Sequence, residues 1–198
     1  MSVATRLSRV ALPVALALTV TACGVNTVPT KEESAKAAWA EVQNQYQRRA
    51  DLIPNLVESV KGAAAQEKGT LTAVTEARAN ATRVQLTGEQ LSDPAAMQRF
   101  AEAQAQVTRT LIPLRNLQEA YPDLKTNQNF LTLQDQLEGT ENRIAIARRD
   151  YNSAVQDYNT TIRTFPALIG ARFIYGAKPL QPFQATAENA DQAPAVKF

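Results

Sequence analysis

The feature that most constrains this chain is one uninterrupted apolar stripe over residues 127–165. Apolar or small side chains recur there at alternating intervals of three and four residues, and the residues between them are mostly polar. This spacing places the stripe on one face of a single helix, which at about 1.5 Å per residue would be roughly 60 Å long. Such a helix needs partners of similar length to be stable in water. The stripe consists of Phe130, Leu133, Leu137, Thr140, Ile144, Ala147, Tyr151, Ala154, Tyr158, Thr161 and Phe165.

A second stripe with the same spacing begins at Trp39 and keeps its phase to about residue 81. Pro54 lies inside it, and because proline removes a backbone hydrogen bond and clashes with the preceding turn, we expect a kink there. Thr30, followed by Glu33, predicts the start of this helix as a capping box. Gly69 leaves two alternatives open: a helix that ends near this glycine, or one continuous helix to about residue 85.

A third stripe occupies residues 97–117, is interrupted by Pro113, and follows a capping residue and a proline at Asp93 and Pro94. The connections between the three striped segments are short, which forces neighbouring helices to run in opposite directions. The sequence therefore predicts an all-α fold, a long antiparallel (up-and-down) four-helix bundle whose first helix is kinked at Pro54.

The first 22 residues have the order of an export signal, with two arginines, then an apolar run, then small residues. The apolar run is too short to cross a hydrocarbon core of about 30 Å as a helix. The single cysteine, Cys23, follows directly, and Val20-Thr21-Ala22-Cys23 resembles the lipobox of bacterial lipoproteins, whose cysteine is acylated. The alternatives are an ordinary secretory signal with an incidental cysteine, or an uncleaved anchor. We expect an exported protein anchored by Cys23 at the periplasmic face, in the outer membrane if the cell has two.

Charge and composition argue against several classes of function. The chain has 21 Lys and Arg against 19 Asp and Glu, and removal of Arg6 and Arg9 with the signal leaves a neutral domain, 19 against 19. A neutral domain gives no electrostatic reason to expect nucleic acid as a partner. The chain contains no histidine, the usual general base near neutral pH and the commonest zinc ligand. We therefore expect no catalytic residues, no metal site and no cofactor.

Polar residues on or beside the stripes are the candidate interaction residues. Two arginines fall on the apolar phase of the second stripe, and two Tyr-Asn pairs lie one heptad apart in the first. One interpretation is structural, since buried polar groups fix the register of long helices. The other is a polar cleft that binds a peptide or a small ligand. The candidates are Arg49, Pro54, Arg78, Tyr151, Asn152, Tyr158 and Asn159.

Five phrases in order, covering roughly residues 39–172, resemble the LemA family. They are Gln47-Arg48-Arg49-Ala50-Asp51-Leu52-Ile53-Pro54-Asn55-Leu56-Val57, Thr75-Glu76-Ala77-Arg78, Glu119-Ala120-Tyr121-Pro122-Asp123-Leu124-Lys125 with Asn129-Phe130, Glu141-Asn142-Arg143-Ile144-Ala145 through Asp150-Tyr151-Asn152, and Tyr158-Asn159 with Phe165-Pro166.

The resemblance implies an all-helical antiparallel bundle held at a bacterial membrane by its N-terminus, and it implies no reaction. The chain departs from the family pattern in its lipoprotein-like start, where a transmembrane helix is usual, in Gln66-Glu67, where a His-Glu pair is frequent, and in Pro113.

These inferences divide the chain into a signal peptide (1–22), a tether (23–30), a helical bundle (31–173) and a flexible, proline-containing tail (174–198). We expect a non-enzymatic envelope lipoprotein that acts as a helical scaffold or adaptor for a protein partner, whose identity the sequence does not indicate. The alternative is a periplasmic bundle that binds a small ligand or a peptide. A deep cavity lined by the two arginines and both Tyr-Asn pairs would favour that alternative.

Overall fold

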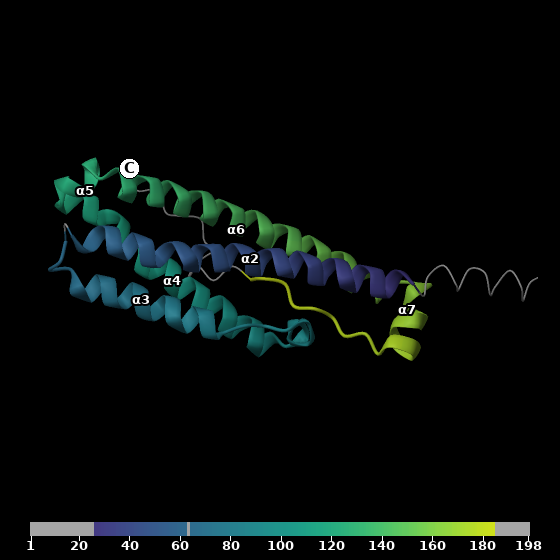
Figure 1. Cartoon of the computed structure of the whole chain (residues 1–198). Helices are drawn as coiled ribbons and strands as arrows, with labels where there is room; N and C mark the ends of the chain where they lie inside the picture. The colour runs from purple at the N-terminus through teal and green to yellow at the C-terminus, as the bar shows by residue number, and fades with distance from the viewer. Residues whose placement is uncertain (1–25, 63, 185–198) are drawn as a thin grey trace, which may run out of the picture.

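The computed structural model describes residues 26–62 and 64–184, and all regular structure within these ranges is helical (Figure 1). Cys23, the predicted signal, the first three residues of the predicted tether and the last 14 residues of the predicted tail lie outside the described residues. The predictions made for them remain predictions.

Four long helices lie side by side (Figure 1). They are α2 (Thr27–Lys61), α3 (Lys68–Arg83), α4 (Pro94–Ala120) and α6 (Gln128–Thr161). Short elements join or follow them: the 3₁₀ turn η1 (Gly88–Ser92), α5 (Pro122–Thr126), α7 (Ala167–Gly170) and the π-helical turn η2 (Ala171–Tyr175). Along its length α2 packs on α6, and α3 packs on α4. Ion pairs from Lys31 to Asp157 and from Arg49 to Glu141 show that α2 and α6 run in opposite directions.

Side-chain caps start α4 and α6. The carboxylate of Asp93 accepts a hydrogen bond from the backbone N–H of Ala95 at 2.9 Å, and Pro94 takes the first helical position of α4. The side-chain oxygen of Asn127 accepts from the N–H groups of Asn129 and Phe130 at the start of α6. Each cap satisfies backbone donors that the first helical turn leaves unpaired.

The first long helix differs from the prediction at both ends. It begins at Thr27, so Thr30 lies inside the first turn and donates its hydroxyl to the carbonyl of Asn26 at 2.8 Å, and the end of the predicted tether is helical. It ends at Lys61, earlier than either alternative for Gly69, which lies in the first turn of α3. The hydroxyl of Tyr121 donates to Glu67 at 3.0 Å, which ties this early break to the corner between α4 and α5.

The core divides into two clusters of buried side chains along the bundle. The Ile53 cluster combines aliphatic side chains of α2, α3 and α4 with Leu124 of α5 and Phe130 and Leu137 of α6. The Trp39 cluster combines aromatic and aliphatic side chains from the first half of α2, η1, the start of α4 and the second half of α6. Seven of the eleven residues in the stripe predicted for α6 are buried, Leu133, Ala154 and Thr161 are half-buried, and Phe165, beyond the end of the helix, is 72% exposed.

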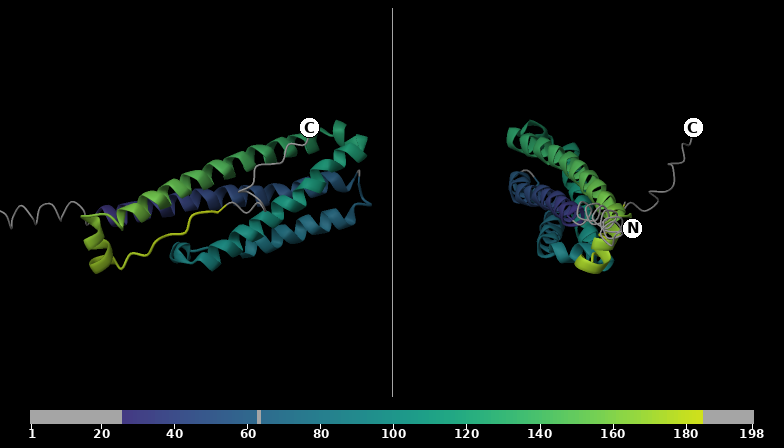
Figure 2. Two further views of the ribbon diagram at one scale, coloured as in Figure 1. Left: turned by 180° about the vertical axis from the view of Figure 1, so that it is seen from behind. Right: turned by 90° about the vertical axis from the view of Figure 1, so that its right-hand side faces the viewer.

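The chain after η2 does not leave the bundle, which differs from the flexible tail expected from residue 174. Gly176 turns the chain in the left-handed region at φ +57°, and residues 177–184, here called the strap, return along the bundle towards its middle (Figure 2). Leu180 and Phe183 of the strap are buried in the Trp39 cluster. The strap therefore belongs to the folded domain.

Candidate functional site

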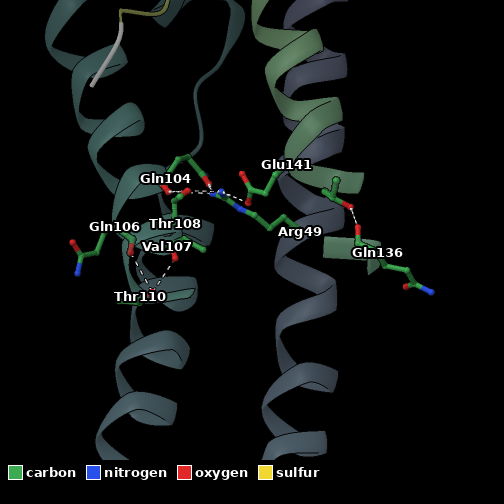
Figure 3. Close-up of polar contacts among 9 residues, drawn as sticks. Arg49, Gln104, Gln106, Val107, Thr108, Thr110, Gln136 and Glu141 are labelled. Atoms are coloured by element: carbon green, nitrogen blue, oxygen red, sulfur yellow. Dashed lines mark hydrogen bonds and ion pairs between the residues drawn. The ribbon is translucent and has the colours of Figure 1, made fainter. Parts of the chain in front are cut away.

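Arg49 is buried between three helices, with 2% of its surface exposed. From α2 it reaches across to α4 and α6, where Nη1 donates to the hydroxyl of Thr108 at 2.9 Å and to Oε1 of Glu141 at 3.0 Å (Figure 3). Its Nη2 donates to the side-chain oxygen of Gln104 at 2.6 Å and to the Gln104 carbonyl at 3.2 Å. We call Arg49, Gln104, Thr108 and Glu141 the arginine layer.

The arginine layer separates the two core clusters. A buried cation is costly unless its hydrogen-bond donors are paired, and a guanidinium presents five of them in a fixed plane. Four oxygens from two other helices accept from Arg49, and the ring of Tyr46 lies 5.0 Å from its central carbon. Because the layer accepts only one longitudinal alignment of the helices, it can set their register.

Arg78 and Pro54, both singled out from the sequence, meet at one backbone carbonyl. Pro54 has no N–H, so the carbonyl of Ala50, four residues earlier, has no partner within the α2 hydrogen-bond ladder. Nε of Arg78, on α3, donates to that carbonyl oxygen at 2.6 Å. The arginine of one helix thus satisfies the acceptor that the proline of its neighbour leaves free.

A cavity of about 290 Å³ opens beside these two arginines, between α2, α3 and α4. Arg49, Arg78, Tyr46 and Gln104 line it, but neither Tyr-Asn pair of α6 does. The single deep cavity that would have joined all the polar candidates is therefore not formed by the described residues.

Asn152 and Asn159 of α6 instead hold the main chain of the strap. The side chain of Asn152 donates to the carbonyl of Phe183 at 3.1 Å and accepts from the Phe183 N–H at 2.8 Å. Asn159 makes the same pair of bonds with Leu180, both at 2.9 Å. Each amide side chain reproduces the donor and acceptor that a neighbouring β-strand would present.

The spacing of the two asparagines matches that of the residues they hold. Seven residues of α-helix rise about 10.5 Å, and three residues of extended chain span about 10 Å. Two asparagines one heptad apart therefore fit the backbone groups of residues 180 and 183 in an extended segment running opposite to α6.

Between these two contacts, Gln181 completes the attachment. Its carbonyl accepts from the hydroxyl of Tyr151 at 2.9 Å, and its N–H donates to the carbonyl of Leu91 in η1 at 2.8 Å. Burial raises the pKa of the Tyr151 hydroxyl above its ordinary value, which keeps the hydroxyl a donor. Tyr158, the other predicted tyrosine, is buried in the Trp39 cluster, and burial raises its pKa as well.

Phe183 is the side chain that anchors the strap, and sequence reasoning missed it. Its ring stacks on Trp39 with centroids 5.6 Å apart and meets the edge of Tyr151 at 5.7 Å. The guanidinium of Arg148 lies 4.8 Å from the Phe183 ring and donates to the Gln184 carbonyl at 3.3 Å. A signal was present, since Leu180 and Phe183 are the large apolar residues of the strap and lie three apart, matching two asparagines one heptad apart.

Neither a cluster of metal-binding side chains nor a membrane-spanning helix occurs in the part of the chain that the structure describes. Among the described residues, no group of three or more His, Cys, Asp or Glu side chains is placed to hold a metal ion. None of the helices in residues 26–184 is both long and apolar enough to cross a membrane.

These observations define an all-helical bundle with a buried polar layer and an extended C-terminal strap held by side-chain amides. The chain belongs to the LemA family, whose family model matches residues 38–198. That match includes the strap as well as the long helices. A search of curated proteins found no match to the chain.

Proposed function

We propose that this protein is an envelope lipoprotein anchored through Cys23 that acts as a non-enzymatic scaffold or adaptor for protein partners. In this proposal the four long helices form one antiparallel, up-and-down bundle, α2 bends at Pro54, and the bend shapes a groove for a partner. The bundle stands at the periplasmic face of a membrane, which in a two-membrane cell is the outer membrane.

The observation that supports a scaffold is how the polar side chains of the interior are used. Arg49 is bonded to Gln104, Thr108 and Glu141, and Arg78 to the Ala50 carbonyl. Asn152 and Asn159 hold the strap. Each of these groups stabilises one arrangement of the chain, as a rigid platform for a partner requires.

A cell-based experiment tests both parts of the proposal. Membranes of cells producing the intact chain are crosslinked, and the crosslinked peptides are identified by mass spectrometry. We expect partner peptides crosslinked to the bundle, and we expect Cys23→Ser to release the domain from membranes or to stall the precursor. Membrane fractionation equal to that of the unsubstituted chain, together with a free thiol at Cys23 in that chain, would contradict the anchor.

One observation favours a second candidate, a bundle that binds an extended peptide. The contacts of Asn152, Asn159 and Tyr151 with the strap involve its main chain, so they place no demand on its side chains. Only Leu180 and Phe183 insert into the core. A segment of another protein with two apolar residues three apart would fit the same trough.

The second candidate has its own test. A fluorescent peptide with the sequence of residues 177–184 is titrated onto the full chain. Phe183→Ala weakens the attachment of the chain's own strap and should raise the affinity for the peptide, and Asn152→Leu added to that variant should abolish binding. If Phe183→Ala leaves the peptide unbound, the trough serves only the strap.

A further inference from the structure

The end of the bundle beyond α6 exposes an unusual number of large apolar side chains. Residues 165–176, here called the elbow, contain α7 and η2. Phe165 is 72% exposed, Phe173 79% and Ile174 63%. Leu168, Ile169 and Tyr175 are also exposed. Soluble proteins rarely gather so many large apolar side chains at one surface unless something covers them.

Contacts at both ends of the elbow keep its large apolar side chains out of the core. Ala167 and Ala171 pack into the Trp39 cluster on one side, which leaves the larger side chains on the other. At its far end Gly176 turns the chain, and the N–H of Ala177 donates to the carbonyl of Ala171 at 2.9 Å. Asn159 then fixes Leu180. The elbow is thus pinned at both ends with its apolar face outward.

The elbow lies at the end of the molecule where α2 begins. Helix α7 packs against α2, and Figure 1 shows it beside the start of that helix. The ion pair from Lys31 to Asp157 places the first turns of α2 against the last turns of α6. From Cys23 to Asn26 there are three residue steps, which span at most about 11 Å. A lipid on Cys23 would therefore hold the bilayer surface within reach of the elbow.

The charge of this region suits an anionic surface. Between Asp157 and Glu188 the sequence contains no acidic residue, while Arg163, Arg172 and Lys178 are all exposed. The acids at the start of α2, Glu32 and Glu33, are both paired with Lys36, at 2.8 and 2.9 Å. Aromatic side chains flanked by basic ones are typical of segments that lie at the interface of a bilayer with anionic lipids.

We propose that the elbow is a membrane-docking surface, with Phe165, Phe173 and Ile174 inserted into the interfacial region of the bilayer that anchors Cys23. The inference rests on the lipid anchor of the proposed function and extends it. A single lipid attachment leaves a protein free to tilt, whereas a second contact beside it fixes the orientation. The bundle then stands upright, with α5 at the end farthest from the membrane.

The experiment uses the full chain, purified with its lipid and reconstituted into vesicles of phosphatidylethanolamine and phosphatidylglycerol. An environment-sensitive fluorophore is attached at Phe173→Cys, and in a matched control at Ile112→Cys, an exposed apolar position on α4 far from the elbow. We expect a blue-shifted emission at position 173 that nitroxide-labelled lipids quench. At position 112 we expect the emission of a water-exposed label without quenching.

Three results would overturn the proposal. Equal emission at the two positions without quenching would show that the elbow lies in water. A blue shift at position 173 that lipids do not quench, and that disappears on dilution, would show that a second copy of the chain covers it. Label uptake by the unsubstituted chain would reveal a free Cys23 thiol and contradict the anchor itself, so this arm separates failure of the anchor from failure of the elbow.

Discussion

Around Ile53 the core is built by side chains from α2, α3, α4, α5 and α6, whereas around Trp39 an extended strap packs with side chains of α2, α4 and α6. A helix satisfies its own backbone hydrogen bonds, so the neighbours of a helix need only apolar side chains. An extended segment cannot do so, and its neighbours must offer donors and acceptors. This difference accounts for Asn152, Asn159 and Tyr151 on α6. Near Ile53 the contact of this kind runs from Arg78 to the Ala50 carbonyl, the acceptor that Pro54 leaves free.

The two halves of the core, the Ile53 cluster and the Trp39 cluster with its strap, should also respond differently to a single substitution. Removing a side chain from the Ile53 cluster leaves a cavity among helices that cannot move apart separately. Removing an apolar side chain from the strap should instead allow its eight residues to detach into water while the helices stay packed. Four predictions test this comparison, in order of expected effect.

Truncating one buried phenylalanine in each half should distinguish a loss of stability of the whole domain from local detachment of the strap. Phe130→Ala should lower the free energy of unfolding by about 3–5 kcal/mol, because it leaves a cavity in a core closed by helices. Phe183→Ala should cost less, and should speed amide exchange at residues 180–183 while α3 and α5 keep their protection. Urea unfolding and hydrogen exchange measure the two effects. Equal loss of protection in α3 for both variants would show that the halves are one unit.

Removing the charge of the arginine layer should weaken both halves at once. Arg49→Met leaves Glu141 and Gln104 without their partner, and we expect a loss of about 3 kcal/mol in the free energy of unfolding, as when one member of a buried ion pair is removed. Arg149→Met, at an exposed position of α6, is the control and should cost under about 0.5 kcal/mol. A small loss for both variants would mean that the layer does not hold the halves together.

Removing one asparagine should loosen only the part of the strap it holds. Asn152→Leu leaves the N–H and carbonyl of Phe183 without their partners, for an expected cost of about 1–2 kcal/mol. Amide exchange should rise at Phe183 more than at Leu180, and Asn159→Leu should give the reverse order. Asn142→Leu, at an exposed position of the same helix, should change neither amide. Identical exchange in all three variants would refute the role of the amide contacts.

The smallest predicted effect is a coupling between Pro54 and Arg78 in the free energy of unfolding. In the unsubstituted chain Arg78→Met removes the donor to the Ala50 carbonyl, at an expected cost of about 1 kcal/mol. Pro54→Ala restores the N–H that the carbonyl lacks, so in that background Arg78→Met should cost less. A double-mutant cycle of unfolding free energies measures the difference. Strictly additive costs would show that the two residues act independently.

The periodicity of the sequence predicted the long helices well, because their stability depends on apolar spacing that can be read directly. Most of the α6 stripe between Phe130 and Tyr158 is buried, with Leu133 and Ala154 half-buried, and the cap at Asp93 starts α4 as expected. The break after Lys61 was not predicted, because Val60 and Leu71 keep the helical phase across it. The side-chain contact from Tyr121 to Glu67 that holds the break is long-range and leaves no periodic signal.

The strap was interpreted as a mobile tail because of its prolines, and this is where sequence reasoning failed. Proline disfavours helix, but it also pre-sets the extended conformation and biases the residue before it in the same direction. The N–H groups of Leu180, Gln181 and Phe183 all have acceptors, and Pro179 and Pro182 have no N–H to satisfy. The two prolines therefore leave no backbone donor to be paired at their own positions. The α6 asparagines that hold the strap lie 21 and 31 residues before it in the sequence, which is too far for a local sequence pattern to reveal the contact.

Of the candidate residues, Arg49 and Arg78 were identified because they fall on the apolar phase, and Asn152 and Asn159 because they stand beside stripe tyrosines one heptad apart. These positions predict that a polar group contacts the interior of the bundle, but they do not reveal its partner; of the four side chains Arg49 is buried and the other three are half-buried. The structure supplies the partners, and they divide the candidates into two places, one inside the bundle and one along the strap.

The arginine layer and the contact of Arg78 have one more consequence, for the length of the molecule. Arg49 and Ala50 are consecutive, and through them α3, α4 and α6 are all aligned to one level of α2. Adding whole heptads to every helix on one side of that level would lengthen the rod and leave the alignment intact. A single added residue would instead rotate everything beyond it by about 100°. The distance from the elbow to α5 is thus a property that can change in steps of about 10 Å while the central level stays the same.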